Sequence, residues 1–146
     1  MIVVRGKPAP QGSKVSTRFG GMREASQFVM PWRNQIVSAC IEQQINNGEI
    51  IEQPVEIFID FLFHRPQGHY GTGRNEGNLK PSAPTYPITR STGDIDKLCR
   101  STLDGLSIPS GGILLRDDSL VVEIKAKKSF AAKGGFQGAF IHIWQL

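Results

Sequence analysis

The fold is decided by the stretch Gly93-Asp94-Ile95-Asp96-Lys97-Leu98-Cys99-Arg100-Ser101-Thr102-Leu103-Asp104-Gly105-Leu106. Apolar residues recur in it at the three- and four-residue spacing of a helix with one buried stripe. They are Ile95, Leu98, Cys99, Leu103 and Leu106. Asp96, Arg100 and Asp104 are spaced four residues apart, so they share another side of the same helix. The stretch therefore predicts a helix with one apolar face and one charged face.

Asp94 stands two residues before Asp96, and two such positions differ by about 200° around an ideal helix. The two carboxylates can converge only if Asp94 is the N-cap residue, where the backbone is extended. Convergent carboxylates beside Lys97 and Arg100 suit a hard cation such as Mg²⁺, together with a phosphate. A plainer interpretation stays open at this point, namely a helix-capping Asp followed by a solvent-exposed ladder of charges.

The composition fits a soluble globular chain. With 146 residues, 39% of them hydrophobic and 21% charged, we expect one domain over 1–146 with a real core. The formal net charge of +4 permits an acidic partner such as nucleic acid. No apolar run has membrane-spanning length and the N-terminus lacks a signal-peptide pattern, so we expect a cytoplasmic protein without a membrane partner. Cys40 and Cys99 have no zinc-site spacing and are expected to be reduced core residues.

The remaining elements predict an α+β fold, a small domain of the α/β type with a mixed β-sheet and two main helices. The second helix is expected at about 31–47, where Pro31 suits the first turn and Gly48 the end. Strands are expected at 1–5, 55–64, about 119–128 and about 136–144. The strand over 55–64 is apolar on both faces, which predicts a central strand or one that a partner covers.

Residues 65–93 show no periodicity and form a long, basic, Gly- and Pro-rich loop. Such a loop is usually functional or disordered. Tyr70 and Tyr86 offer stacking groups between cations, as in a nucleic-acid-binding arm, and a mobile linker is the alternative. The basic residues that we consider candidates for DNA contact are Lys7, Lys14, Arg74, Lys80, Arg90, Lys125, Lys127 and Lys128.

The pair Asp117-Asp118 precedes the strand expected at 119–128. Because side chains alternate along a strand, Asp118 is in phase with Leu120 and Val122, on the face that the helix covers. A carboxylate there needs a cation. We therefore predict Asp118 as a third metal ligand that reaches Asp94 and Asp96. Asp117, on the other face, is a candidate for orienting a ligand of the metal.

Three carboxylates, nearby cations and a basic surface fit metal-assisted hydrolysis of a phosphodiester. Carboxylate-bound metal ions activate a water and stabilise the leaving oxygen, while Lys97 or Arg100 stabilises charge in the transition state. Signatures of other chemistries are absent from the sequence, including a Walker loop, G-x-G-x-x-G, a nucleophile elbow, H-E-x-x-H and paired C-x-x-C. No small-molecule cofactor is expected.

The motif at 94–106, followed by Arg116-Asp117-Asp118-Ser119, resembles the RusA family of Holliday junction resolvases, and the loop segments 68–75 and 80–84 resemble its phage members. The resemblance extends from the first strand to about Lys128. It implies an intertwined homodimer that requires Mg²⁺, with Mn²⁺ as the alternative. The implied substrate is a four-way DNA junction, cut by paired symmetric nicks. Asp94, Asp96 and Asp118 fall on the metal-binding acids of the family.

The sequence departs from the family pattern near the acids. Gly93 stands where proline is common, Lys97 where the founding member has asparagine, and Arg100 where it has a functionally important lysine. An Arg keeps the charge of a Lys but not its geometry. Two other functions are therefore carried forward: a DNA-binding recombination accessory protein that does not cut, and a nuclease that prefers flaps or forks.

Overall fold

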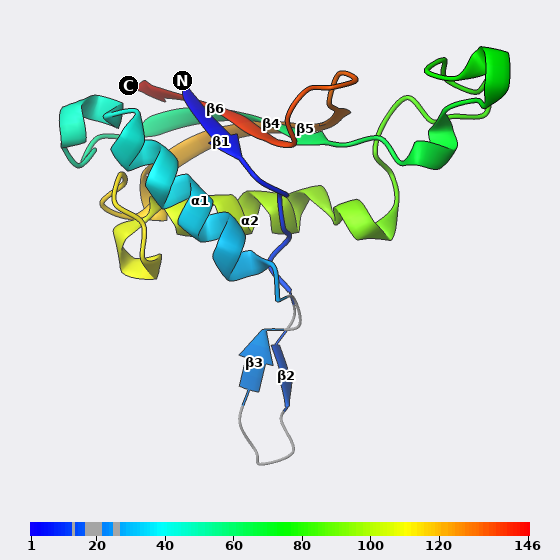
Figure 1. Ribbon diagram of the computed structural model, residues 1–146. Coiled ribbons are helices and arrows are strands. Elements are labelled where there is room, and N and C mark those ends of the chain that lie inside the picture. Colours follow the sequence, from blue (N-terminus) through cyan, green and yellow to red (C-terminus); the bar gives the residue numbers. More distant parts are fainter. Residues whose placement is uncertain (13, 17–21, 25–26) are drawn as a thin grey trace.

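The computed structural model describes residues 1–12, 14–16, 22–24 and 27–146, with side chains described outside 13–26. A four-stranded mixed sheet in the order β1-β6-β4-β5 is covered on one face by α1 and α2 (Figure 1). The elements are β1 (Ile2–Arg5), β2 (Lys14–Ser16), β3 (Met22–Glu24), α1 (Val29–Glu42), β4 (Val55–Phe63), α2 (Ile95–Leu106), β5 (Val121–Phe130) and β6 (Gly138–Gln145). The prediction of an α+β fold with a mixed sheet and two main helices is confirmed.

The central position of β4 follows from its sequence. Its alternate residues from Val55 to Phe63 are all buried, and they face the helices. The residues between them, including Phe58 and Leu62, are half-buried on the opposite, outer face. β4 pairs with β6 in antiparallel and with β5 in parallel orientation, so both of its edges are hydrogen-bonded. The strand that is apolar on both faces is therefore central, as predicted.

α2 packs one face against the sheet and α1, although this face begins later than the sequence predicts. Leu98 and Leu106 are fully buried, whereas Ile95 is 40% exposed. The predicted stripe is thus wrong at Ile95, because this side chain lines an open hollow rather than the core. Gly105 permits the close approach of α1: a Cβ there would lie 2.9 Å from the Cδ1 atom of Ile36.

Three elements differ from their predicted bounds by two residues or more. α1 begins at Val29 and ends at Glu42. It ends there because Gln44, Asn46 and Asn47 adopt positive φ and turn the chain into a short 3₁₀ helix, η1 (Ile45–Gly48). β5 begins at Val121 rather than 119, because Asp118–Leu120 form another 3₁₀ turn, η6. β6 begins at Gly138 rather than 136.

The loop over 65–93 contains short 3₁₀ turns and isolated bridges, in agreement with its lack of periodicity. Its base is fixed to the sheet by Arg65, which donates to the Pro84 carbonyl (2.8 Å) and lies 4.1 Å from the ring centroid of Phe130. The hairpin of β2 and β3, which extends away from the sheet in Figure 1, was not predicted. No helix in the described part of the chain is long and apolar enough to cross a membrane.

The contact between the helices can be tested at Thr102. The buried Trp32 indole donates its Nε1 hydrogen to Thr102 Oγ1 at 3.1 Å. Thr102→Val keeps the shape but leaves this donor unpaired, which should lower the free energy of unfolding by about 1–3 kcal/mol. Urea denaturation followed by Trp32 fluorescence, in a Trp144→Phe background, measures the change. Thr72→Val, a control at an exposed threonine, should leave stability unaltered. An unchanged free energy of unfolding in Thr102→Val would contradict the role of this bond.

Candidate active site

Asp94 and Asp96 both lie at the N-terminus of α2. Asp94 is the N-cap residue with extended backbone (φ −78°, ψ 140°), as predicted. Its side chain makes no capping hydrogen bond to the first turn, so its carboxylate is not used by the helix. Both carboxylates line one open hollow of about 650 Å³, whose other residues are 86–90, 93, 95 and 127–128. We call this the acid-lined hollow.

The chain enters α2 through a turn at Gly93 that is held from two sides. Gly93 has φ 85°, and a Cβ there would lie 2.6 Å from Pro10 Cγ. Proline cannot adopt this φ, so the departure from the family pattern at Gly93 corresponds to a different local backbone. Lys128 donates from Nζ to the Gly93 carbonyl at 2.7 Å. The direction of Asp94 therefore depends on two segments far from it in the sequence.

Lys128 was expected from the sequence to be a surface cation that contacts DNA, but in the structure its side chain is half-buried. In the parallel register it pairs with Phe61, so its side chain leaves the sheet on the helix face. Burial lowers the pKa of the Lys128 ammonium, and the nearby Asp94 carboxylate opposes this effect. The two-residue period of β5 already indicated this face, because Lys128 is in phase with Ile124 and Ala126. We missed that signal.

A second hollow, of about 550 Å³, lies on the other side of Asp94. It is lined by residues 10–12 together with Arg90, Gly93, Asp94 and Lys97. The Lys97 ammonium lies 3.6 Å from Asp94. The wall formed by 10–12 is fixed to α2, because the Gln11 amide donates to the Lys97 carbonyl at 2.9 Å. Arg90 is exposed and lines both hollows.

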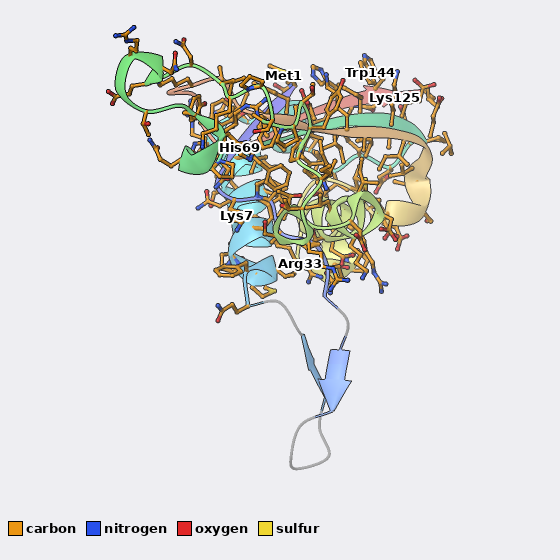
Figure 2. All side chains as sticks on the ribbon, turned by 90° about the vertical axis from the view of Figure 1, so that its right-hand side faces the viewer. Met1, Lys7, Arg33, His69, Lys125 and Trp144 are labelled. Atoms are coloured by element: carbon orange, nitrogen blue, oxygen red, sulfur yellow. The ribbon has the colours of Figure 1, made fainter. Side chains whose placement is uncertain are left out.

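Asp104 does not take part in an exposed ladder with Asp96 and Arg100. Its carboxylate accepts a hydrogen bond from Arg33 of α1 at 2.8 Å, and both side chains are only 17% exposed. The same Arg33 nitrogen donates to Gln11 at 2.5 Å. Figure 2 places Arg33 on the helix side of the molecule, close to the point where the hairpin of β2 and β3 leaves it. Asp96 and Arg100 remain exposed.

Asp96 also affects the neighbouring cysteine. Burial, and secondarily the Asp96 charge, raises the pKa of the Cys99 thiol to about 11. Burial alone raises the pKa of Cys40 to about 11. Both cysteines are free, and at neutral pH their thiols stay protonated. Neither is therefore suited to act as a thiolate ligand or nucleophile.

Asp117 and Asp118 have opposite electrostatic environments. Asp117 Oδ1 accepts the Ser119 amide hydrogen at 2.8 Å, and this bond lowers the pKa of Asp117. Partial burial raises the pKa of Asp118, and the charges of Asp117 and Asp104 raise it further. The alternation of a strand does not apply to Asp118, because this residue belongs to η6 and precedes the first residue of β5. Its electrostatic coupling to Asp104 nevertheless places it near α2.

The acids of one chain form two groups. Asp118 is coupled to Asp104, which follows Asp94 by ten residues, or about 15 Å along a helix. In Figure 1, β5 starts beside the C-terminal end of α2 and ends toward its N-terminal end. Within the described residues, no group of three or more His, Cys, Asp or Glu side chains is placed to hold a metal ion. Asp94 and Asp96 therefore share a hollow, and Asp118 lies apart from them.

Asp94 and Asp96 are the residues of the acid-lined hollow that could hold a magnesium ion. Mg²⁺ is commonly held by one or two carboxylates, with waters and substrate phosphate completing its coordination. Asp94 and Asp96 supply oxygen donors of this kind and both are exposed to solvent. Mn²⁺ accepts the same donors.

The other cations predicted to contact DNA are spread over the molecule. Arg74 and Lys80 are exposed in the loop over 65–93, and Lys7 is exposed beside Phe28, 5.8 Å from its ring centroid. Figure 2 shows Lys7 on the helix side and Lys125 at the sheet. The side chain of Lys14 lies outside the described residues, and that of Lys127 is 3.7 Å from Asp60. The structure therefore does not gather these cations into one patch.

A family model described as Endodeoxyribonuclease RusA matches residues 5–141. The chain belongs to the RusA family. The matched residues include both acid groups, Arg100, both main helices and the whole of β4 and β5, so the resemblance seen in the sequence is confirmed. No curated protein matches this RusA-family chain closely.

The different environments of Asp117 and Asp118 predict stability changes of opposite sign. A raised pKa means that folding disfavours the charged Asp118, so its contribution to stability falls as pH rises through the folded-state pKa. In metal-free buffer at pH 7, Asp118→Asn should raise the free energy of unfolding. The lowered pKa of Asp117 has the reverse consequence, because the charged Asp117 stabilises the fold at neutral pH and this stabilisation is lost in acid. Asp117→Asn should therefore lower the free energy of unfolding at pH 7. Urea denaturation at pH 7 compares the two variants, and equal shifts would refute the assignment of the two environments.

Proposed function

We propose that this RusA-family chain is a Mg²⁺-dependent endonuclease that resolves four-way DNA junctions by paired symmetric nicks. The observation that carries the proposal is the acid-lined hollow, where Asp94 and Asp96 meet cations at the start of α2. In this proposal the protein acts in phage-type recombination, repair or replication. It acts in the cytoplasm, and if a phage encodes the gene this is the cytoplasm of the host cell. The family match supports an endodeoxyribonuclease, and the hollow supports the metal and the phosphate.

Charged residues at and around the start of α2 have distinct roles in this proposal. Asp94 and Asp96 hold the ion, and a bound Mg²⁺ supplies an activated water and stabilises the leaving oxygen. Lys97 and Arg100, both exposed on the first turns of α2, bind the phosphate and stabilise the negative charge that develops on it. Lys128 keeps the Gly93 turn in place and so orients Asp94.

DNA binding outside the hollow is assigned to the exposed basic residues of the loop and the N-terminal segment. Arg74, Lys80 and Arg90 lie along 65–93, and Lys7 lies near the start of the hairpin of β2 and β3. Contacts between such side chains and phosphates are independent of sequence and weaken as salt increases. The net charge of +4 is consistent with this role.

We further propose that the active form is a homodimer. Symmetric resolution requires two cuts, and a four-way junction has twofold character that suits a C₂ dimer. The outer face of the sheet carries half-buried Phe58 and Leu62 together with Trp144, which is 51% exposed, and no described helix covers it (Figure 1).

One assay tests the proposed activity against its alternatives. A synthetic four-way junction, a linear duplex and a flap are each incubated with the protein, with and without Mg²⁺. Paired nicks in the junction that require Mg²⁺ support the proposal. Junction binding without any cutting would instead indicate a recombination accessory protein, and preferential cutting of the flap would indicate a flap or fork nuclease.

The acids should be essential for cutting but not for binding. We expect Asp94→Asn and Asp96→Asn to abolish junction cleavage and to leave junction affinity equal or higher, because a carboxylate that repels phosphate is removed. Asp118→Asn should also lose most turnover, whereas Asp117→Asn should keep substantial activity. Gel-shift and cleavage assays over a Mg²⁺ titration measure both properties. Near-normal cutting by Asp94→Asn or Asp96→Asn would refute the metal site.

The dimer should be detectable by light scattering at micromolar concentration, both free and bound to a junction. A monomer in both states would contradict it.

A further inference from the structure

The acid-lined hollow has an apolar wall that the proposed chemistry does not use. Tyr86 is 60% exposed and Ile88 is 78% exposed, and they flank the buried Pro87. These three residues, which we call the apolar ledge, line the same hollow as Asp94 and Asp96. Large apolar side chains beside two carboxylates need an explanation, because this exposed surface does not contribute to the core.

Hydrogen bonds connect the segment that carries the apolar ledge to the segment that carries Asp94. Thr92 donates its hydroxyl hydrogen to the Pro87 carbonyl at 3.2 Å or to the Thr89 carbonyl at 2.8 Å. The next residue, Gly93, donates its amide hydrogen to the Arg90 carbonyl at 3.1 Å, which closes η4 (Arg90–Thr92). A short hydrogen-bonded turn therefore connects the ledge to the start of α2. This turn fixes the position of the ledge side chains relative to Asp94.

We propose that the apolar ledge binds one unstacked nucleobase of the DNA strand that is cut. This inference rests on the proposed function and adds a nucleobase subsite to the phosphate site. The hollow is lined by the Tyr86 ring and the Ile88 side chain, and also by the exposed Arg90 and by Lys128, whose ammonium group donates to the Gly93 carbonyl. A nucleotide contains the matching groups, a flat apolar base and an anionic phosphate. The base stacks on Tyr86, which leaves its phosphate beside the acids.

The ledge thereby distinguishes branched DNA from linear duplex. A base must leave its stack to lie on Tyr86, and this costs a few kcal/mol within an intact duplex but least where pairing is already disturbed. Base pairs that flank the crossover of a four-way junction have a neighbour on one side that belongs to another arm. Stacking on an aromatic side chain depends little on which base is present. The subsite therefore selects for DNA structure more than for sequence.

The test uses binding in metal-free buffer, so that it does not require cutting. The probe is a synthetic four-way junction with 2-aminopurine beside the crossover, compared with the same label in the middle of an arm and with a labelled linear duplex. We expect binding of the wild-type chain to change the emission at the crossover only. Tyr86→Ala should remove that change and weaken junction affinity by about 5- to 150-fold, the loss typical of one base–aromatic stack. Its affinity for the duplex should not change.

Two controls isolate the ring. Tyr86→Phe should retain the emission change and the affinity, because the phenyl ring keeps the face on which a base stacks. Ile41→Ala removes another exposed apolar side chain, 61% exposed on α1 and outside the acid-lined hollow, and should behave as the wild type. Circular dichroism confirms that each variant is folded.

The outcomes separate this inference from the proposed function. Wild-type affinity and emission in Tyr86→Ala would overturn the nucleobase subsite and leave the nuclease proposal standing. An equal loss of affinity for junction and duplex would also overturn it, since the ring would then be a general DNA contact. A chain that shows the Tyr86-dependent emission change but cuts no branched DNA with Mg²⁺ would support the subsite and refute the nuclease.

Discussion

The burial of one face of α2 is the constraint on which the rest of the structure depends. Leu98 and Leu106 are fully buried between the sheet and α1, and a buried leucine contributes about 1.5–3 kcal/mol to folding. Rotation of the helix would expose them, so the opposite side, with Asp96 and Arg100, is held in solvent. The closeness of α1 at Gly105 limits sliding along the axis as well. Apolar packing, rather than attraction between charges, thus determines where the acids point.

Local periodicity explains which parts of the molecule were predictable. The stripe that contains Leu98 and Leu106 predicts α2, and the extended cap required for Asp94 to converge with Asp96 is present. The alternation of β4 likewise predicts its central position. In each case a pattern within about ten neighbouring residues is sufficient to predict the element, because these residues bury one continuous face of a single helix or strand.

Features that depend on contacts between distant segments were not predictable in this way. The pairing of Arg33 with Asp104 joins residues separated by 71 positions, and nothing around Asp104 distinguishes it from an exposed helix acid. The start of β5 depends on one hydrogen bond from the Ser119 amide to Asp117, which stabilises a 3₁₀ turn where alternation suggested a strand. That single turn invalidates the phase argument for Asp118. The alternation along β5 predicts the face of the sheet on which Lys128 lies. Its hydrogen bond to the Gly93 carbonyl could be recognised only in the folded structure.

The placement of β5 at the edge of the sheet has a consequence for how copies of the chain can associate. An edge strand presents unpaired backbone groups that can add a strand from another molecule and so begin aggregation. The outer face of β5 carries Glu123, Lys125 and Lys127 in alternate positions. Charged side chains on an edge strand, lysines above all, are one of the devices by which proteins discourage pairing with a further strand. The β5 edge is thereby protected against addition of a strand from another copy, and self-association is directed to other surfaces.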